Sequence, residues 1–463
     1  MKYRALFVLT LLVAGSSRSE AVGYCGSHGG SPYDYRELLC HALVFYEANR
    51  SGYLPSDQRV EWRGDSALND GADNGVNLEG GYYDAGDLVK FGFPLAYTVT
   101  FLSWGYITYG EGYVQAGQTQ YLEKTIKWAT DFILKAHTTP TTIWAQVGDG
   151  DLDHSLWGPP EDMTMARPSY KLDQNAPGSE VAAESAAGLA AASIVFKNSN
   201  PSYSATLLQA AKELFDFANN YREMYTNSLP EAADFYVTFG YGDELTWGAI
   251  WLYRATGDDS YRALAEQLFT EFDVAYGASF SWENKKSGCI ALFAELLGGN
   301  YLNILQSNAA ELRNFQTTPG GLHYFQHWGS LRYALNHGFI AFRAADLGLD
   351  TAANNEFGER QINYALGSNP RSSSYVVGVG NNPPTHCHHR AASCPGPGIP
   401  CGWDYGNSAN PNPHILYGAL VGGPDQNDGY TDERQNWEQN EVGCDYNAAL
   451  AANLARMITH QPL

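Results

Sequence analysis

Apolar residues recur at intervals of three and four along most of the chain, which is the spacing of a helix with one buried face. This pattern predicts twelve helices, at 35–50, 94–109, 121–137, 180–197, 204–222, 243–256, 260–275, 288–298, 302–317, 330–347, 352–366 and 441–460. Alternating β-branched runs are few, and the clearest spans 374–379. The class is therefore expected to be all-α. Antiparallel helix pairs without a solenoid repeat period favour a closed toroid.

Three long segments separate these helices, at 51–93, 138–179 and 367–440. Loops of that length are uncommon unless they are functional. The first and the last hold the densest clusters of Asp, His, Trp and Gly, so the functional site is expected where they meet at one end of the helical barrel. No Pro/Thr/Ser-rich tether interrupts the helical pattern, which predicts a single domain over 21–463.

The charge of the chain argues against some partners, and its N-terminal sequence indicates the cellular compartment. The net charge of -22 repels nucleic acid and anionic membranes. Residues 1–20 have a basic start at Lys2 and Arg4, an apolar run and then small residues, which is the pattern of a secretory signal peptide. The mature protein is therefore expected to be secreted and extracellular. No other stretch approaches the length of a membrane span, so a soluble product is expected, and the protein is expected to be a monomer.

Cysteines fit an oxidising compartment, and the chain has seven: Cys25, Cys40, Cys289, Cys387, Cys394, Cys401 and Cys444. The preferred pairs are Cys25 with Cys40 and Cys394 with Cys401. A Cys387–Cys444 pair is a further possibility, which would leave Cys289 as a core thiol. A zinc site is disfavoured because no Cys-x-x-Cys sequence occurs.

The segment 80–93 places Asp84 and Asp87 three residues apart among aromatic residues. On a turn, these two carboxylates can point to the same side and hold one water while drawing a proton from it. A second acidic segment, 430–448, places Asp432 and Glu441 ahead of an Ala/Leu-rich helix, where burial would raise a carboxyl pKa enough for a general acid. The alternatives are an Asp-Gly turn for the first segment and helix capping for the second.

These two segments, together with 374–384 and the His388-His389-Arg390 sequence, resemble glycoside hydrolase family 9, the animal endo-β-1,4-glucanases in particular. The resemblance implies an (α/α)6 barrel and hydrolysis of internal β-1,4-glucan bonds with inversion at the anomeric carbon. It implies Asp87 as the base, Asp84 as the second aspartate that holds the water, and Glu441 as the general acid. No cofactor is expected for catalysis.

Further matches to the family imply substrate-binding residues along a groove. Rings suit the C–H faces of glucose, whereas a core role is the alternative for each Trp. The set is His154, Trp157, Trp328, Arg332, His388, Arg390, Asp432 and Tyr446. The chain departs from the family pattern at Cys387, where Pro or an aliphatic residue is usual, and at Gly443, where Ser, Thr or Ala is usual.

A structural calcium is a further expectation from the resemblance. Family members carry calcium in a loop like that of Asp243 and Glu244, with another acid from a segment like the one holding Glu283. Phe239 stands where a Ser is expected. The acidic run 149–153 is not an EF-hand, because its sixth position is His154 rather than Gly.

Three functions are compatible with these observations. The first is an active inverting endoglucanase that prefers soluble or amorphous β-1,4-glucan, since no separate carbohydrate-binding module is present. The second is a glucan-binding protein without catalysis, which loss of Asp87 or Glu441 would favour, yet both are present. The third is an (α/α)6 enzyme of another class, such as a lyase, although a lyase for acidic sugars would need a basic cleft.

Overall fold

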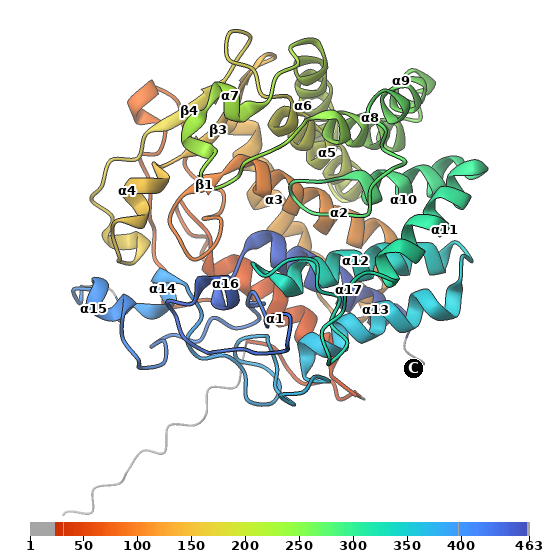
Figure 1. Cartoon of the computed structure of the whole chain (residues 1–463). Helices are drawn as coiled ribbons and strands as arrows, with labels where there is room; N and C mark the ends of the chain where they lie inside the picture. The colour runs from red at the N-terminus through yellow and green to blue at the C-terminus, as the bar shows by residue number, and fades with distance from the viewer. Residues whose placement is uncertain (1–23, 31, 397, 461–463) are drawn as a thin grey trace, which may run out of the picture.

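A computed structural model describes residues 24–460, except 31 and 397; the expected signal peptide lies outside the described residues. Within this range the chain forms twelve helices of more than ten residues, which alternate along the sequence between an outer and an inner layer (Figure 1). The outer helices are α1 (Tyr35–Ala48), α3 (Thr119–Ala136), α6 (Pro201–Asn220), α9 (Asp259–Glu271), α11 (Asn300–Arg313) and α13 (Thr351–Leu366). The inner helices are α2 (Gly92–Gln115), α5 (Ser179–Phe196), α8 (Gly242–Thr256), α10 (Lys286–Leu297), α12 (Ser330–Asp346) and α17 (Cys444–Thr459).

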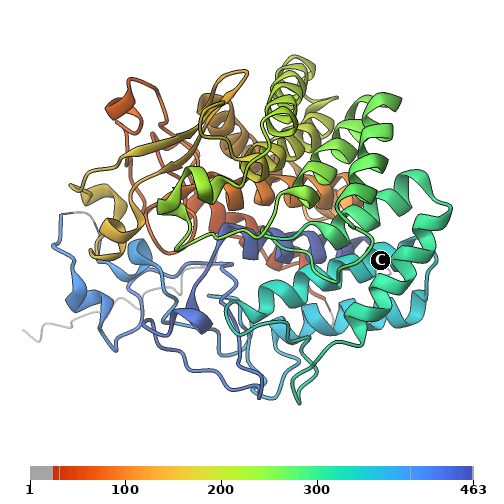
Figure 2. The ribbon, with the colours of Figure 1, turned by 45° about the horizontal axis from the view of Figure 1, so that its top comes forward.

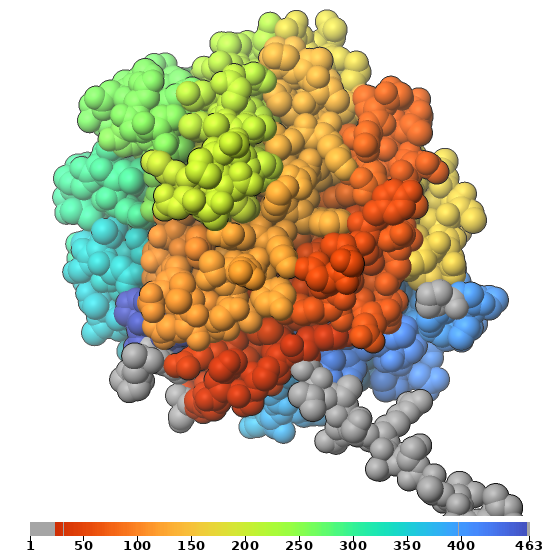
Figure 3. Space-filling view, turned by 180° about the vertical axis from the view of Figure 1, so that it is seen from behind, coloured from red at the N-terminus to blue at the C-terminus, as the bar shows by residue number. Residues whose placement is uncertain are grey.

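The inner helices form a closed ring. Each contacts the next in the order α2, α5, α8, α10, α12 and α17, and α17 returns to α2. This ring within an outer layer is the (α/α)6 barrel expected from the sequence, and every predicted helix overlaps one of the twelve. Figure 2 shows the outer helices α9 and α11 in green alongside the barrel, while Figure 3 shows the face behind Figure 1, covered largely by the red and orange N-terminal segments.

Burial of the two layers explains why their sequences differ. Helix α5 is apolar around its circumference and is buried on nearly every side, whereas α6 buries one face that includes Leu207, Leu214 and Phe215. Helix α5 is also long and apolar enough to cross a membrane by composition, but 94% of it is buried inside the fold. Its hydrophobicity therefore reflects its place in the inner ring.

The six inner helices run in one direction, so equivalent ends meet. At their C-terminal ends, Arg254, Arg343 and Arg456 form ion pairs with Glu295 and Asp346, all of them between neighbouring helices except Arg343–Asp346, which lies within α12. Cations at helix C-termini offset the negative end of the helix dipole. The opposite end gathers the N-termini, whose positive dipole ends favour carboxylates. The long loops of the chain lie at that end.

The segment 138–179 differs from the irregular loop that the sequence predicts. It contributes to a four-stranded antiparallel sheet of β1 (Lys90–Phe91), β2 (His137–Thr139), β3 (Thr142–Val147) and β4 (Ser169–Leu172). Strand β3 pairs with β1 and β2 along one edge and with β4 along the other. The sheet thus ties the chain just after Asp87 to the segment that leads into the short helix α4 (Gly150–His154).

Two further predictions of secondary structure are wrong in detail. The run 374–379 forms only an isolated bridge between Val376 and Leu420, because Gly378 at a φ of 75° turns the backbone away. The last helix begins at Cys444 rather than 441. Glu441 instead has extended backbone angles after the short helix α16 (Trp437–Asn440) and forms a parallel bridge with His388.

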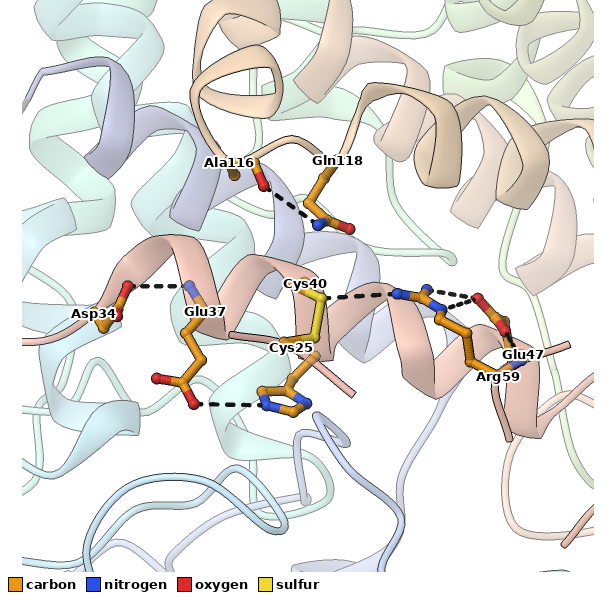
Figure 4. The surroundings of a disulfide bond; sticks show 9 residues. Cys25, Asp34, Glu37, Cys40, Glu47, Arg59, Ala116 and Gln118 are labelled. Carbon is orange, nitrogen blue, oxygen red and sulfur yellow. Dashed lines mark hydrogen bonds and ion pairs between the residues drawn. A yellow bond between two sulfur atoms is a disulfide. The ribbon is translucent and has the colours of Figure 1, made fainter. Parts of the chain in front are cut away.

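The two preferred disulfides, Cys25–Cys40 and Cys394–Cys401, are confirmed. The first fastens the N-terminal segment to α1, beside Arg59, which also pairs with Glu47 (Figure 4). The possible Cys387–Cys444 pair is wrong. Both of these cysteines are free and buried, as is Cys289: the Cys387 sulfur contacts the Asn412 amide, and the Cys444 thiol donates to the Tyr83 carbonyl.

Candidate active site

Backbone contacts bring the three sequence motifs together at the N-terminal end of the barrel. The Arg390 N–H donates to the Gly86 carbonyl at 2.9 Å, and the Cys444 N–H donates to the Asp84 carbonyl at 3.0 Å. A Cβ atom on Gly86 would lie only 1.9 Å from the His388 carbonyl oxygen. Gly86 therefore allows this close approach, which explains why a glycine separates the two aspartates.

The two aspartates lie side by side, Asp84 buried and Asp87 half-buried. Asp84 accepts a hydrogen bond from the Tyr236 hydroxyl, and Asp87 accepts one from the Ala85 N–H at 3.2 Å. Burial and the neighbouring Asp87 carboxylate raise the pKa of Asp84 well above its ordinary range. Burial and the nearby Asp153 raise the pKa of Asp87 to about 6. Asp87 is therefore the member of the pair that ionises more readily near neutral pH.

Glu441 lies where α16 and α17 meet and is held by two donors. The Trp328 indole N–H donates to its Oε2 at 2.6 Å, and the Tyr446 hydroxyl donates to the same oxygen at 3.2 Å. Burial nevertheless raises the pKa of Glu441 to about 7, since removal from water disfavours the charged form more than these bonds stabilise it. The site thus holds two carboxyl groups whose pKa values are both raised, with that of Glu441 the higher.

Arg332 lies on α12 and orients the surroundings of Glu441. Its guanidinium forms an ion pair with Asp445 at 3.1 Å and stacks between the rings of Tyr333 and Tyr446 at 4.6 and 4.8 Å. Arg332 is almost completely buried. Its visible action in this structure is to fix Tyr446, whose hydroxyl reaches Glu441.

His388 and Arg390 lie together at the site. In this structure His388 offers an acceptor nitrogen, and Arg390 is engaged by a carboxylate. The His388 Nδ1 lies 2.7 Å from the Arg434 carbonyl, which can only accept, so Nδ1 carries the proton and Nε2 is an acceptor. Burial lowers the pKa of His388 to about 4, which keeps it neutral. Arg390 is buried and donates to Asp153 at 2.6 Å.

One exposed aromatic ring beside the site, that of Trp403, was not indicated by the sequence motifs. Trp157 is only 5% exposed, because its ring packs against Gly406 and His388. Trp403, on the short helix α15 (Trp403–Gly406), is 40% exposed and lies 5.2 Å from Trp157 between ring centroids. Its indole N–H donates to the Ser155 carbonyl, which joins α15 to the segment after α4; both short helices lie on the same side of the molecule (Figure 1).

Two other expected residues lie at the margins. His154, at the end of α4, has a partly exposed side chain near Asp87. Asp432 is engaged by a distant segment: its carboxylate accepts hydrogen bonds from the backbone N–H groups of Thr385 and His386. Asp432 therefore joins the segment that leads into α16 to the one that carries His388.

The residues expected to bind calcium meet only in part. Asp243 accepts from the Lys285 N–H at 2.7 Å, and one oxygen of Glu244 pairs with the buried Lys285 ammonium at 3.2 Å. The other oxygen of Glu244 is buried and has no hydrogen-bond partner among the described residues. Glu283 instead accepts from the Tyr333 hydroxyl. Asp243 and Glu244 thus fit a cation, whereas Glu283 is engaged elsewhere.

Sequence reasoning missed Tyr236, Asp153, Trp403 and Asp445. Tyr236 reaches Asp84 from a loop more than a hundred residues away, and nothing in its local sequence marks it. Asp153 directly precedes His154, and Trp403 follows the Cys394–Cys401 loop closely. For Asp153 and Trp403, closeness in sequence to these features is the signal that could have indicated them.

The comparison with known proteins agrees with this geometry. The model of glycosyl hydrolase family 9 matches residues 35–454. The chain belongs to glycosyl hydrolase family 9.

Among family 9 structures, an endoglucanase from the termite Nasutitermes takasagoensis is 52% identical, with a TM-score of 0.91 over 92% of this chain and 99% of that chain. A cellulase of C. cellulolyticum in complex with cellobiose is 35% identical, with a TM-score of 0.87 over 93% and 99% of the two chains. Endoglucanase B of Cellulomonas fimi is 45% identical over 97% of this chain. The chain spans only 45% of the length of that relative.

Proposed function

We propose that this family 9 protein is an endo-β-1,4-glucanase that hydrolyses internal glucosidic bonds with inversion. One observation carries the proposal: backbone contacts bring Asp84 and Asp87 to one site with Glu441, and the pKa of Glu441 is raised to about 7 while that of Asp87 is raised to about 6. An inverting glycosidase needs a protonated acid for the leaving oxygen and an ionised base for a water. Relatives named endoglucanase and a cellobiose-bound relative supply the substrate class.

In the proposed mechanism, Asp84 and Asp87 hold the attacking water, and Asp87 takes its proton as the water attacks the anomeric carbon. Glu441 gives its proton to the departing glycosidic oxygen, which breaks the bond. The Trp328 and Tyr446 donors then stabilise the carboxylate that remains on Glu441. Room for a water requires the base and acid to stand about 6.5 to 9.5 Å apart.

Proton NMR of the first product tests the proposal. Hydrolysis of cellohexaose should release the α-anomer before mutarotation, because water attacks from the face opposite the leaving group. Release of the β-anomer would contradict the assignment of Asp87 as a base and indicate a covalent intermediate instead. A chain that binds cellohexaose but releases no product would be a glucan-binding protein.

The pH dependence of hydrolysis should be a narrow bell. The rising limb is expected near pH 6, where Asp87 loses its proton, and the falling limb near pH 7, where Glu441 loses its own. The measurement is kcat/KM for carboxymethylcellulose from pH 4 to 9 at constant ionic strength. Activity that stays constant up to pH 9 would show that no group of raised pKa serves as the acid.

Trp403 is expected to bind a sugar unit distant from the cleaved bond. Its exposed ring lies beside Trp157, next to the segment that carries His388. Trp403→Ala should raise KM for cellohexaose by roughly 2- to 10-fold, the equivalent of about 0.5–1.5 kcal/mol of ring contact. Trp403→Phe should restore most of the affinity, and a dinitrophenyl cellobioside should be affected little. An equal loss on both substrates would indicate a structural role.

Calcium is expected to stabilise the fold through Asp243 and Glu244 without taking part in catalysis. Burial and the Asp243 charge raise the pKa of Glu244 well above its ordinary value, so a bound cation would offset the cost of two adjacent carboxylates. Calcium at 100 times its Kd would add about 2.7 kcal/mol to the free energy of unfolding. EDTA should lower the Tm, Ca²⁺ should restore it, and Asp243→Asn should abolish the difference. An unchanged Tm would exclude this site.

We infer further that the protein is secreted and acts as a single-domain monomer. The two disulfides support an oxidising compartment, and the strongly acidic composition argues against nucleic acid as a partner. Soluble or amorphous β-1,4-glucan is the proposed substrate form. Gel filtration and product release from amorphous and crystalline cellulose test these points.

A further inference from the structure

Asp153 presents an unpartnered oxygen beside the proposed base. The residue is fully buried at the end of α4, and its Oδ2 accepts from the Arg390 guanidinium at 2.6 Å. Its Oδ1 is buried as well and has no hydrogen-bond partner in the described part of the chain. A buried carboxylate oxygen without a partner is costly. This oxygen is therefore suited to a cationic ligand.

The imidazole of His154 is the third candidate ligand group, and its Nδ1 lies 3.6 Å from Asp153 Oδ2. Its Nδ1 lies 2.7 Å from the Gly150 carbonyl, so Nδ1 carries the proton and Nε2 keeps a lone pair. The side chain is 45% exposed, which gives an ion a path from solvent. A backbone carbonyl that holds the other ring nitrogen is the usual support for an imidazole ligand.

Asp87, Asp153 and His154 each offer a ligand atom, and these three atoms lie within 4.8 Å of one another. Ligands of a tetrahedral zinc ion, with bonds of about 2.0–2.2 Å, lie roughly 3.4 Å apart, so ion binding requires the His154 imidazole to turn on the Phe235 ring, which it contacts at 5.0 Å between centroids. Two carboxylates and one imidazole suit Zn²⁺. Ca²⁺ and Mg²⁺ need six or more oxygen ligands and suit it poorly.

The charges around this cluster favour a cation. The acidic side chains are Asp84, Asp87 and Asp153, against two cations: Arg390, which pairs with Asp153, and Arg167, which acts on Asp153 from farther away. The negative excess raises the local concentration of divalent ions. Arg390 occupies one oxygen of Asp153 and leaves the other free, so ion binding does not require the Asp153–Arg390 pair to break.

We propose that Asp87, Asp153 and His154 form a binding site for a divalent transition-metal ion, with Zn²⁺ as the best fit, and that the bound ion inhibits the enzyme. The ion would take the carboxylate lone pair that Asp87 needs for a proton and would occupy the position of the water. The inhibition rests on the proposed function of Asp87, whereas the binding does not.

Isothermal titration calorimetry of the whole protein with ZnCl₂, in a non-coordinating buffer with saturating Ca²⁺, measures binding without reference to activity. One Zn²⁺ per chain is expected. His154→Gln should weaken that binding by at least about 10-fold, since even loss of a group that merely supports a ligand costs about 10- to 100-fold. The matched control is His327→Gln, because the His327 side chain is 64% exposed and has its own acidic neighbour, Glu438.

Equal Zn²⁺ affinity in the parent and in His154→Gln, or an equal loss in His327→Gln, would overturn the proposed site. Hydrolysis of carboxymethylcellulose should fall as Zn²⁺ fills the site and recover with EDTA. Binding that depends on His154 but leaves hydrolysis unchanged would overturn the inhibition. A protein that binds Zn²⁺ in this way but hydrolyses no glucan even after EDTA treatment would contradict the proposed function and leave the metal site standing.

Discussion

Asp87→Asn lowers kcat on β-1,4-glucan by about 10²- to 10⁴-fold, the usual contribution of a general base, while glucan binding remains measurable. The amide has nearly the same shape as the carboxylate but cannot accept the proton of the attacking water. Asp84 does not replace it as the base, because burial and the neighbouring charge raise the pKa of Asp84 and because Asp84 already accepts a hydrogen bond from the Tyr236 hydroxyl. Steady-state kinetics and calorimetry with cellohexaose measure the two effects.

The melting temperature distinguishes loss of the catalytic base in Asp87→Asn from misfolding of the variant. The folded protein holds Asp87 at a raised pKa, so its contribution to stability is fully present below the ordinary pKa of Asp and is lost as the pH rises through about 6. Above pH 6 the neutral amide removes a buried charge and its repulsion with Asp153. The Tm of Asp87→Asn at pH 7.5 should therefore equal or exceed that of the parent. Asp259→Asn, at an exposed position on α9, is the matched control with parental activity.

Glu441→Gln is expected to reduce hydrolysis of natural glucan by about 10²- to 10⁴-fold and to spare substrates that need no proton. A sugar hydroxyl leaves poorly as an alkoxide, whereas dinitrophenolate leaves unaided. The ratio of kcat/KM for dinitrophenyl cellobioside to that for cellohexaose should therefore rise steeply in the variant. The falling limb of the pH profile should also disappear, since it reports the ionisation of Glu441.

The control for this prediction is Glu356→Gln on the exposed face of α13, which makes the same chemical change away from the site. An equal loss on both substrates would contradict the assignment of Glu441 as the general acid. Such a result would instead indicate that the Trp328 and Tyr446 contacts to Glu441 hold the shape of the site. The Tm of the variant distinguishes a local change from a general loss of folding.

Helix positions could be predicted because helical periodicity is a local property of the sequence. The apolar spacing of α6 arises from one buried face, and the all-round apolar character of α5 indicates an inner position. The beginning of α17 could not be predicted in the same way. Glu441 adopts an extended backbone because it pairs with His388, a contact between distant segments.

The small sheet escaped prediction for a related reason. Five of the six residues of β3 are buried, so the strand lacks the polar alternation that would distinguish it from a short helix. Its identity is decided by pairing with β1, β2 and β4, which lie elsewhere in the chain. Strand pairing is a non-local interaction, and a single sequence carries little information about it.

The sequence by itself determined the twelve-helix class, the two disulfides and the motifs that hold Asp84, Asp87 and Glu441, because each is encoded by neighbouring residues. The tertiary structure alone decided their electrostatics: burial raises the pKa of Glu441, and Asp153 acts on Asp87 across space. It also decided that Trp403, rather than Trp157, exposes its ring. Desolvation and charge interactions depend on distance in the folded chain, and distance along the sequence does not determine them.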